Sequence, residues 1–314
     1  MNILIIDEMH PSIIPLLEHE GFKVNYRPDI SRSEIETVID QYHGLIIRSK
    51  TTMDRPLLEK ATQLRFIGRA GAGLDKIDVD YLTSRNIPIY NAPEGNRDAV
   101  AEHAIGMLLA LFNHIPRADL QVRHKIWNRE QNRGEELSGK TVGIFGYGNM
   151  GQAFAKRLSG FDVKVLAYDK YKSGFGGVWA EEASFERIQE EADILSIHVP
   201  LTSETRNFFT SGVINGFKKP FYLINTARGE VISFETLNTA LESGKIRGAL
   251  LDVLEKEKLD KLDVAQEEAF QKLTNKDNVL FSPHVAGWTF QSYEKINKVL
   301  VSKLLNGLGK NNFG

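Results

Sequence analysis

The chain has 314 residues, of which 42% are apolar and 25% charged, a composition typical of a globular protein large enough for two domains. Its net charge of −2 gives no global field that would attract nucleic acid or an anionic membrane, and we expect neither as a partner. The lack of cysteine excludes disulfides, thiolate metal sites and a cysteine nucleophile, and we expect no metal centre. The N-terminal apolar run is too short for a signal peptide, so we expect a cytoplasmic protein.

The first part of the chain alternates short apolar strands with helices. Continuous apolar strands separated by helices favour a parallel sheet that is covered on both faces. A long helical pattern with an apolar face follows at residues 98–123, and we interpret it as one helix that leads into a second domain. The predicted strands are residues 2–7, 22–26, 44–48, 66–70 and 87–90, and the predicted helices are residues 13–20, 32–42 and 55–62.

The most informative stretch is residues 141–169, TVGIFGYGNMGQAFAKRLSGFDVKVLAYD, which has the pattern strand, glycine turn, helix and second strand. Gly146 permits a tight turn, Gly148 lets the backbone approach a pyrophosphate, and Gly151 lets the helix pack closely on the strand. The N-terminus of the helix offers free N–H groups to that phosphate. The stretch therefore predicts a dinucleotide-binding βαβ unit.

Asp169 ends the second strand of this unit. A carboxylate at that point accepts hydrogen bonds from the adenosine ribose hydroxyls and repels a 2′-phosphate. We therefore expect the cofactor to be NAD rather than NADP.

Further elements of the same kind follow. Because the last helix has no sheet of its own, we expect it to return to the N-terminal domain. We predict an α/β protein of two doubly wound parallel-sheet domains with a ligand-binding cleft between them. Residues 1–97 and 288–314 form the substrate-binding domain in this prediction, and residues 98–287 form the NAD-binding domain. The further strands are predicted at residues 194–199, 221–225, 247–252 and 278–281, helices at residues 234–243 and 291–308, and a charged helix or loop at residues 256–276.

Four polar residues follow the ends of apolar strands, where ligands bind in open α/β sheets: Arg228, Asp252, Glu257 and His284. Arg228 could clamp a carboxylate with two hydrogen bonds. His284 could exchange a proton with an alcohol near neutral pH, and a carboxylate such as Glu257 would stabilise its imidazolium. Each also has a plain structural interpretation, since Arg228 and Glu257 could be surface charges, Asp252 a cap and His284 a buried polar group.

Over nearly its whole length the chain resembles the D-isomer-specific 2-hydroxyacid dehydrogenases, and within them the short-form D-3-phosphoglycerate dehydrogenases. Several of the shared motifs are specific to that family, and they occur in the family's order. The matching segments are GLIIRSKT (44–51), FIGRAGAGLDKID (66–78), AVAEHAIGMLLAL (99–111), GKTVGIFGYGNMG (139–151), HVPLTSET (198–205), INTARGEVI (224–232), GALLDV (248–253) and SPHVAG (282–287).

The resemblance implies a flavodoxin-like substrate domain, a Rossmann NAD-binding domain and a mechanism. Arg228 binds and polarises a 2-oxo acid, His284 is the acid/base, and Glu257 pairs with His284. The family usually has Pro after the catalytic Glu, whereas this chain has Lys258, so Glu255 remains an alternative partner. The implied cofactor-binding residues are Gly146, Tyr147, Gly148, Asn149, Met150, Gly151, Asp169, His198, Pro200, Thr205, Thr226, Ala227, Asp252 and Gly287. The implied substrate-binding residues are Arg48, Ser49, Arg69, Gly71, Ala72 and Gly73.

The substrate is expected to be a small 2-hydroxy or 2-oxo acid. The candidate cations for the phosphate of 3-phosphoglycerate are Arg48, Lys50, Arg69, Lys76, Arg129 and Arg133. The alternatives are a glyoxylate-, hydroxypyruvate- or lactate-type acid and, in a different class, an NAD-sensing binding module like the corepressor relatives. The resemblance also implies a homodimer formed through the helix at 98–123 and the following arm. Because the sequence ends 30 residues after His284, we expect no C-terminal regulatory domain.

Overall fold

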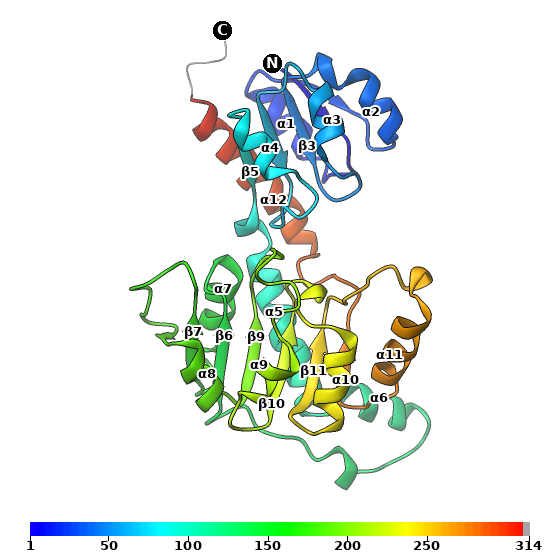
Figure 1. The fold of residues 1–314 in the computed structure, drawn as a ribbon, viewed down its shortest axis with the longest axis vertical. Coiled ribbons are helices and arrows are strands. Elements are labelled where there is room, and N and C mark those ends of the chain that lie inside the picture. Colours follow the sequence, from blue (N-terminus) through cyan, green and yellow to red (C-terminus); the bar gives the residue numbers. More distant parts are fainter. Residues whose placement is uncertain (310–314) are drawn as a thin grey trace. The chain divides into compact units, whose positions relative to one another are not determined.

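The computed structural model describes residues 1–309 of the chain and divides it into two compact units (Figure 1). Unit 1 comprises residues 1–97 together with the segment that begins at Trp288, and unit 2 comprises Asp98–Gly287. The last part of the predicted substrate-binding domain, residues 310–314, lies outside the described residues. No helix among the described residues is long and apolar enough to cross a membrane.

Unit 1 contains a parallel sheet of five strands in its described part, with the order β2-β1-β3-β4-β5. This order is the flavodoxin-like doubly wound arrangement, in which the strand order reverses beside β1. Its strands are β1 (Asn2–Ile5), β2 (Lys23–Tyr26), β3 (Gly44–Ile47), β4 (Phe66–Arg69) and β5 (Ile89–Asn91). Its helices are α1 (Ile13–His19), α2 (Arg32–Val38), α3 (Arg55–Lys60), α4 (Val79–Ser84) and α12 (Phe290–Leu308), with 3₁₀ turns at Ile39–Gln41 and Pro93–Gly95.

Helix α12 completes the core of unit 1. Its residues Ile296, Leu300 and Leu304 are almost wholly buried, in one cluster with Ile3 and Phe66 from the sheet. At about 25 cal/mol for each Å² of apolar surface removed from water, each of these side chains stabilises the unit by about 1.5–3 kcal/mol. The last helix of the chain therefore belongs to the same core as the first strand.

Unit 2 contains a parallel sheet of seven strands within the described range, with the order β12-β11-β10-β9-β6-β7-β8. The order reverses between β6 and β9, and both neighbours of that point carry predicted cofactor residues at their carboxyl ends. The strands are β6 (Thr141–Phe145), β7 (Lys164–Tyr168), β8 (Glu181–Glu182), β9 (Ile194–Ile197), β10 (Phe221–Asn225), β11 (Ile246–Leu251) and β12 (Val279–Phe281). These two all-parallel sheets confirm the predicted fold class.

The helices of unit 2 correct one prediction. The expected single helix at residues 98–123 is wrong: the chain forms two helices, and His114 between them takes a left-handed φ of 50°. Pro116 explains the break, because it has no N–H and its ring collides with the carbonyl four residues earlier in a continuous helix. The helices are α5 (Arg97–Phe112), α6 (Ile115–Arg123), α7 (Asn149–Leu158), α8 (Phe185–Glu191), α9 (Ser211–Asn215), α10 (Phe234–Glu242) and α11 (Val264–Thr274), with 3₁₀ turns at Glu130–Asn132, Gly229–Val231 and Leu259–Lys261.

Three short helices, α4, α8 and α9, and the two-residue strand β8 have no counterpart among the sequence-based predictions. Each of these helices begins at a capping side chain, respectively Asp78, Ser184 and Thr210. Helices of five to seven residues carry too few apolar positions for a periodic pattern, so the cap is the main signal that the sequence offers.

Candidate active site

The glycine turn of unit 2 lies between β6 and α7. Gly146 has a φ of +99°, and a Cβ atom there would lie 2.8 Å from the carbonyl oxygen of His198. A Cβ atom on Gly151 would lie 2.2 Å from the carbonyl oxygen of Gly146, so any larger residue would force the helix away from the turn. A Cβ atom on Gly148 would meet no atom within 4 Å, which leaves open space in front of the N-terminus of α7. This arrangement fits a pyrophosphate.

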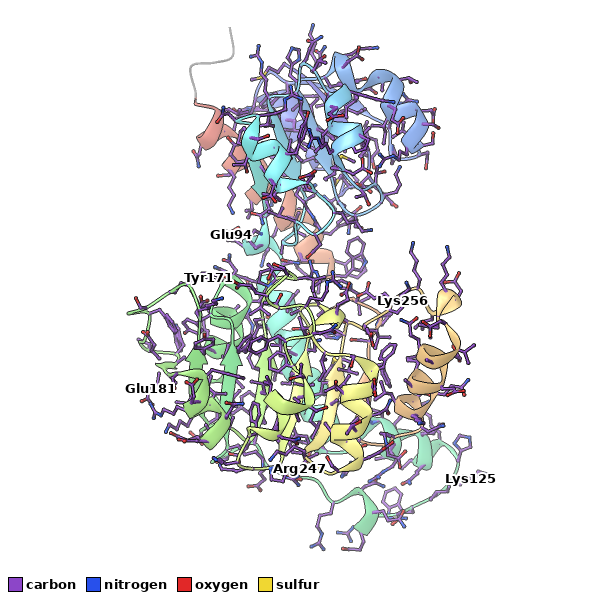
Figure 2. The ribbon with its side chains drawn as sticks, viewed as in Figure 1. Glu94, Lys125, Tyr171, Glu181, Arg247 and Lys256 are labelled. Carbon is purple, nitrogen blue, oxygen red and sulfur yellow. The ribbon has the colours of Figure 1, made fainter. Side chains whose placement is uncertain are left out.

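Asp169 directly follows β7 and fixes this turn. Its Oδ2 accepts a hydrogen bond from the backbone N–H of Tyr147 at 2.9 Å, and its Oδ1 accepts one from the N–H of Tyr171 at 3.0 Å. Tyr171 lies on the exposed loop that follows β7 (Figure 2). The Tyr147 ring stacks on Phe175 with ring centroids 4.8 Å apart, which ties the same loop to the turn. The carboxylate is thus held beside the turn by backbone donors.

Other predicted cofactor residues follow β9 and β10. Burial lowers the pKa of His198 to about 3, so its ring is neutral, and its Nε2 lies 2.8 Å from Ser196 Oγ. Thr205 Oγ1 donates to the carbonyl oxygen of Pro200 at 2.6 Å and shapes the loop after β9. Thr226 Oγ1 is buried and has no hydrogen-bond partner among the described residues. A buried hydroxyl without a partner is costly, and a bound cofactor that contacted it would remove that cost.

The two residues predicted to exchange and stabilise a proton lie together at the end of β12. His284 Nδ1 is 2.8 Å from Glu257 Oε1, and each side chain is about half exposed. The hydrogen bond from Glu257 raises the pKa of His284, against the opposite effect of burial. Because Nδ1 faces the carboxylate, Nε2 is the ring atom left to exchange a proton with a substrate.

The alternative carboxylate, Glu255, has a different contact. Its Oε2 accepts a hydrogen bond at 2.6 Å from the N–H of Phe234, the first residue of α10. A carboxylate at this place compensates the free N–H groups and the positive dipole end of the helix. The geometry therefore brings Glu257 to His284 and gives Glu255 a structural contact.

Asp252 lies directly after β11 and holds the loop of His284. It is 1% exposed, and its carboxylate accepts hydrogen bonds from the N–H groups of Val285 and Ala286, both at 2.9 Å. Ser282 Oγ donates to Asp252 Oδ1 at 2.5 Å. Sequence reasoning missed Ser282, although it stands in the SPHVAG motif two residues before His284.

Arg228 follows β10 through a turn that Asn225 shapes. The fully buried Asn225 side chain accepts from the N–H of Ala227 at 3.1 Å and donates to the carbonyl oxygen of Arg228 at 2.9 Å. The positive charge of Arg228 lowers the pKa of His284, so the two groups interact electrostatically. Sequence reasoning also missed Asn225, whose signal is a polar residue that ends an otherwise apolar strand.

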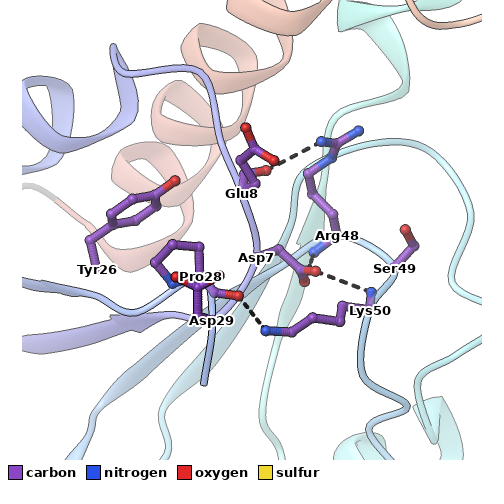
Figure 3. Close-up of a pocket in the computed structure, with 8 residues that line it drawn as sticks. All are labelled: Asp7, Glu8, Tyr26, Pro28, Asp29, Arg48, Ser49 and Lys50. Carbon is purple, nitrogen blue, oxygen red and sulfur yellow. Dashed lines mark hydrogen bonds between the residues drawn. The ribbon is translucent and has the colours of Figure 1, made fainter. Parts of the chain in front are cut away.

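In unit 1 the loop after β3 carries the predicted substrate residues Arg48 and Ser49. Asp7 positions this loop, because its carboxylate accepts from the N–H of Arg48 at 2.6 Å and from the N–H of Lys50 at 3.1 Å. The Arg48 guanidinium lies 4.0 Å from the centroid of the Trp288 ring. Asp7 and the loop residues Arg48, Ser49 and Lys50 line a pocket of about 550 Å³ (Figure 3). The other residues that line it are Glu8, Tyr26, Pro28 and Asp29.

Four of the cations proposed for a phosphate donate to backbone carbonyl oxygens: Arg48, Lys50, Arg69 and Lys76. Lys50 Nζ donates to the carbonyl oxygens of Pro28 and Ile30, the latter at 2.9 Å, and Lys76 Nζ donates to that of Ser49 at 2.6 Å. In the arm of unit 2, Arg133 pairs with Glu130 at 2.7 Å. Arg48 is stacked by its face on the Trp288 ring, and its Nη1 donates to the carbonyl oxygen of Glu8 at 3.2 Å.

The loop after β4 contains the predicted carboxylate cradle Gly71-Ala72-Gly73. Gly71 has a φ of +139°, and a Cβ atom there would lie 1.7 Å from Arg69 Nη1. Asn91 Nδ2 donates to the carbonyl oxygen of Ala72 at 2.8 Å, and the N–H of Ala92 donates to that of Gly71. Among residues 1–309 no group of three His, Asp or Glu side chains is arranged to bind a metal ion.

Two parallel sheets, a glycine turn at a strand-order reversal and a His–Glu pair beyond the end of β12 in the same sheet define a dinucleotide-binding α/β protein. Residues 105–286 match the family model of the D-isomer specific 2-hydroxyacid dehydrogenase, NAD binding domain. The chain belongs to the D-isomer-specific 2-hydroxyacid dehydrogenases and carries their NAD-binding domain.

Relatives and solved structures agree with this assignment. The chain is 32% identical over 98% of its length to D-3-phosphoglycerate dehydrogenase of Archaeoglobus fulgidus, of which it covers 57%. It is 35% identical over 89% of its length to hydroxypyruvate reductase of Thermotoga maritima, of which it covers 89%. The crystal structure of Aquifex aeolicus D-lactate dehydrogenase with NAD and lactic acid has a TM-score of 0.81 at 26% identity, covering 97% of this chain and 94% of that one. The chain thus spans little more than half of several phosphoglycerate dehydrogenases that it matches.

Proposed function

We propose that this protein is an NAD-dependent D-2-hydroxyacid dehydrogenase that interconverts a D-2-hydroxy acid and its 2-oxo acid. The observation that carries the proposal is the His284–Glu257 pair, 2.8 Å apart, in the unit that bears the dinucleotide turn. A carboxylate on one ring nitrogen, with the other ring nitrogen available to a substrate, is the arrangement of an acid/base histidine rather than of a surface charge. The pair provides what a proton exchange coupled to hydride transfer requires.

In the direction of reduction, the glycine turn and Asp169 would hold NADH, which would supply the hydride that C2 of the 2-oxo acid accepts. His284, in its protonated form, gives the Nε2 proton to the carbonyl oxygen, so that the carbonyl becomes an alcohol. Arg228 binds the acid and polarises the carbonyl, while Glu257 stabilises the imidazolium and fixes the ring. In the direction of oxidation, neutral His284 removes the hydroxyl proton.

Unit 1 supplies the substrate contacts in this proposal. Arg48, Ser49, Arg69 and the turn Gly71-Ala72-Gly73 bind the carboxylate and the remainder of the acid. We propose 3-phosphohydroxypyruvate as the first candidate substrate, supported by the phosphoglycerate dehydrogenase relatives and by Arg48. Hydroxypyruvate is the second candidate, because Lys50 and Lys76 are engaged by backbone carbonyls and because the chain covers 89% of the Thermotoga reductase.

The test is NADH oxidation by the purified protein against 3-phosphohydroxypyruvate, hydroxypyruvate, glyoxylate, pyruvate and 2-oxoisocaproate. A kcat/KM for the phosphorylated acid at least about tenfold above the others, equivalent to ~1.4 kcal/mol, supports the first candidate. Preference for hydroxypyruvate supports the second. Tight NADH binding with turnover of none of the acids contradicts the dehydrogenase proposal and favours the NAD-sensing module.

We further propose a homodimer formed through α6 and the arm that follows it. Ile115, Leu120, Val122 and Ile126 are all at least half exposed, and Trp127 is 80% exposed. So many large apolar side chains on one short segment favour burial against a second copy of the chain. Light scattering of the wild type and of a Trp127→Lys variant tests this proposal. We also propose a cytoplasmic location for the protein, which cell fractionation tests.

A further inference from the structure

His103, on helix α5, contacts the network that holds the loop of His284. Its Nε2 lies 2.8 Å from Ser282 Oγ and 3.7 Å from Asp252 Oδ1, so the serine stands between the histidine and the carboxylate. The three residues come from α5, the segment after β11 and the segment after β12. They form one hydrogen-bonded chain inside unit 2.

The chemistry of these three side chains determines which group donates each hydrogen bond. An ionised carboxylate only accepts hydrogen bonds, and a serine hydroxyl has one hydrogen to donate. Since Ser282 Oγ and Asp252 Oδ1 are 2.5 Å apart, the serine gives its hydrogen to Asp252. The contact between His103 and Ser282 therefore requires the ring to donate, which places a hydrogen on Nε2 of His103.

Asp252 transmits this constraint to His284. Its carboxylate accepts from the N–H groups of Val285 and Ala286, and its own carbonyl oxygen accepts from the N–H of His284 at 2.8 Å. His284 has a φ of 55°, in the left-handed region, a strained conformation for a non-glycine residue that persists only where the surroundings enforce it. The hydrogen bonds to Asp252 are the surroundings that enforce it.

We propose that His103 is a positioning residue for the reaction of His284. By donating Nε2–H to Ser282 it fixes the serine and Asp252, and through them the strained loop that presents His284 to the substrate. This role of His103 rests on the proposed dehydrogenase function, because the placement of His284 matters only if His284 is the acid/base of that reaction. A displacement of about 1 Å at a reacting group can lower a rate by up to ~100-fold.

The kinetic test compares His103→Leu with His103→Gln. Leucine removes the donor, whereas the amide N–H of glutamine can take the place of Nε2–H. With NADH and hydroxypyruvate, kcat is expected to fall at least about tenfold in His103→Leu and to return to within about threefold of wild type in His103→Gln. His19→Leu, at a ring that is 85% exposed on α1, is the matched control and keeps the wild-type kcat. Wild-type kcat in His103→Leu, or equal loss in both variants, overturns the proposal.

A second readout needs no substrate. Long-range ¹H–¹⁵N NMR of the histidine rings reports which ring nitrogen of His103 carries the hydrogen, and the same spectra follow the titration of His284. We expect the Nε2–H form for His103, and we expect the His284 midpoint to move to lower pH in His103→Leu as the loop loosens its contact with Glu257. An Nδ1–H form, or an unchanged His284 midpoint, overturns the proposal.

Two features keep this test separate from the proposed function. If the wild type reduces none of the acids, the dehydrogenase proposal fails. The NMR result still shows whether His103 donates its Nε2–H to Ser282. If His103→Leu does not fold, Ser282→Ala breaks the same chain at its next link and is expected to give the same loss of kcat and the same change in the His284 midpoint. A wild-type profile in Ser282→Ala overturns the proposal.

Discussion

The cofactor turn of unit 2 and the substrate loop of unit 1 follow strands of similar parallel sheets, but they are held in place by different means. In unit 2, Gly146 and Gly151 permit the turn by their own lack of a side chain, and Asp169 fixes it from the neighbouring strand. In unit 1, Arg48 is held by Asp7, 41 residues away, and by the Trp288 ring. A turn that depends on glycine can be predicted from the sequence, whereas a loop that is held by residues far away in the chain cannot. The comparison predicts that changes in unit 2 remove function and changes in unit 1 tune it.

The largest effect is expected for His284→Ala. Loss of the proton donor should lower kcat by about 10²- to 10⁴-fold. NADH affinity, measured by fluorescence titration, should stay within about twofold of wild type, because the glycine turn does not contact this residue. A parallel loss of NADH binding would show that His284 acts on the cofactor rather than as an acid/base.

Replacement of each glutamate by glutamine separates the two carboxylates. Because Glu257 raises the pKa of His284, reduction by the wild type should fall only as pH rises through that raised pKa. In Glu257→Gln the pKa of His284 should drop, so this basic limb should move to lower pH. At a pH above both midpoints the variant should be slower than the wild type by about tenfold for every pH unit that separates the two midpoints. The measurement is the pH dependence of kcat/KM.

Glu255→Gln is the matched control for Glu257→Gln. It should leave the pH profile unchanged and lower the free energy of unfolding by roughly 0.5–1 kcal/mol, because a charged group is lost at the start of α10. Urea denaturation measures this loss. A pH profile that is altered in Glu255→Gln and not in Glu257→Gln would show that Glu255, rather than Glu257, is the partner of His284.

Asp169→Ala tests the cofactor preference. Removing the carboxylate should raise the ratio of kcat/KM with NADPH to that with NADH by about tenfold or more, the equivalent of ~1.4 kcal/mol. Asp169 also accepts the N–H of Tyr147, so we expect NADH to bind less tightly as well. An unchanged ratio would remove Asp169 from the ribose site.

The smallest effect belongs to unit 1. Trp288→Leu removes the ring that stacks on Arg48, an interaction worth about 0.5–1 kcal/mol at a partly exposed site. KM for the 2-oxo acid should rise about two- to fivefold with kcat little changed. Trp179→Leu, on a loop of unit 2, is the control. A loss of kcat as large as that in His284→Ala would contradict the contrast between the units.

The sequence predicted those features that depend on near neighbours in the chain. Alternating apolar strands and the glycine turn were enough for the fold class and the NAD-binding domain, and the matching sequence motifs for the family resemblance. The structure and the relatives confirm all three. The break at Pro116 was overlooked because the apolar pattern continues on both sides of it. The roles of the individual site residues remain predictions.

Contacts between distant segments could not be predicted. Glu255 and Glu257 lie two residues apart and have the same side chain. Only their different partners, Phe234 and His284 respectively, distinguish them. Likewise, nothing near Lys50 in the sequence shows that the carbonyl oxygens of Pro28 and Ile30 accept its hydrogen bonds. Such pairings are decided by the packing of whole elements rather than by local preference.

The shared core of α12 and the first strands bears on how the chain folds as it is synthesised. Residues of unit 2 are contiguous in the sequence, so this unit can close its core once residue 287 has left the ribosome. Unit 1, although its first strands emerge before unit 2, lacks Ile296, Leu300 and Leu304 until the whole of unit 2 has been synthesised. Unit 1 therefore begins to emerge before unit 2 but completes its core after it, and its unfinished apolar surface stays exposed while unit 2 is synthesised.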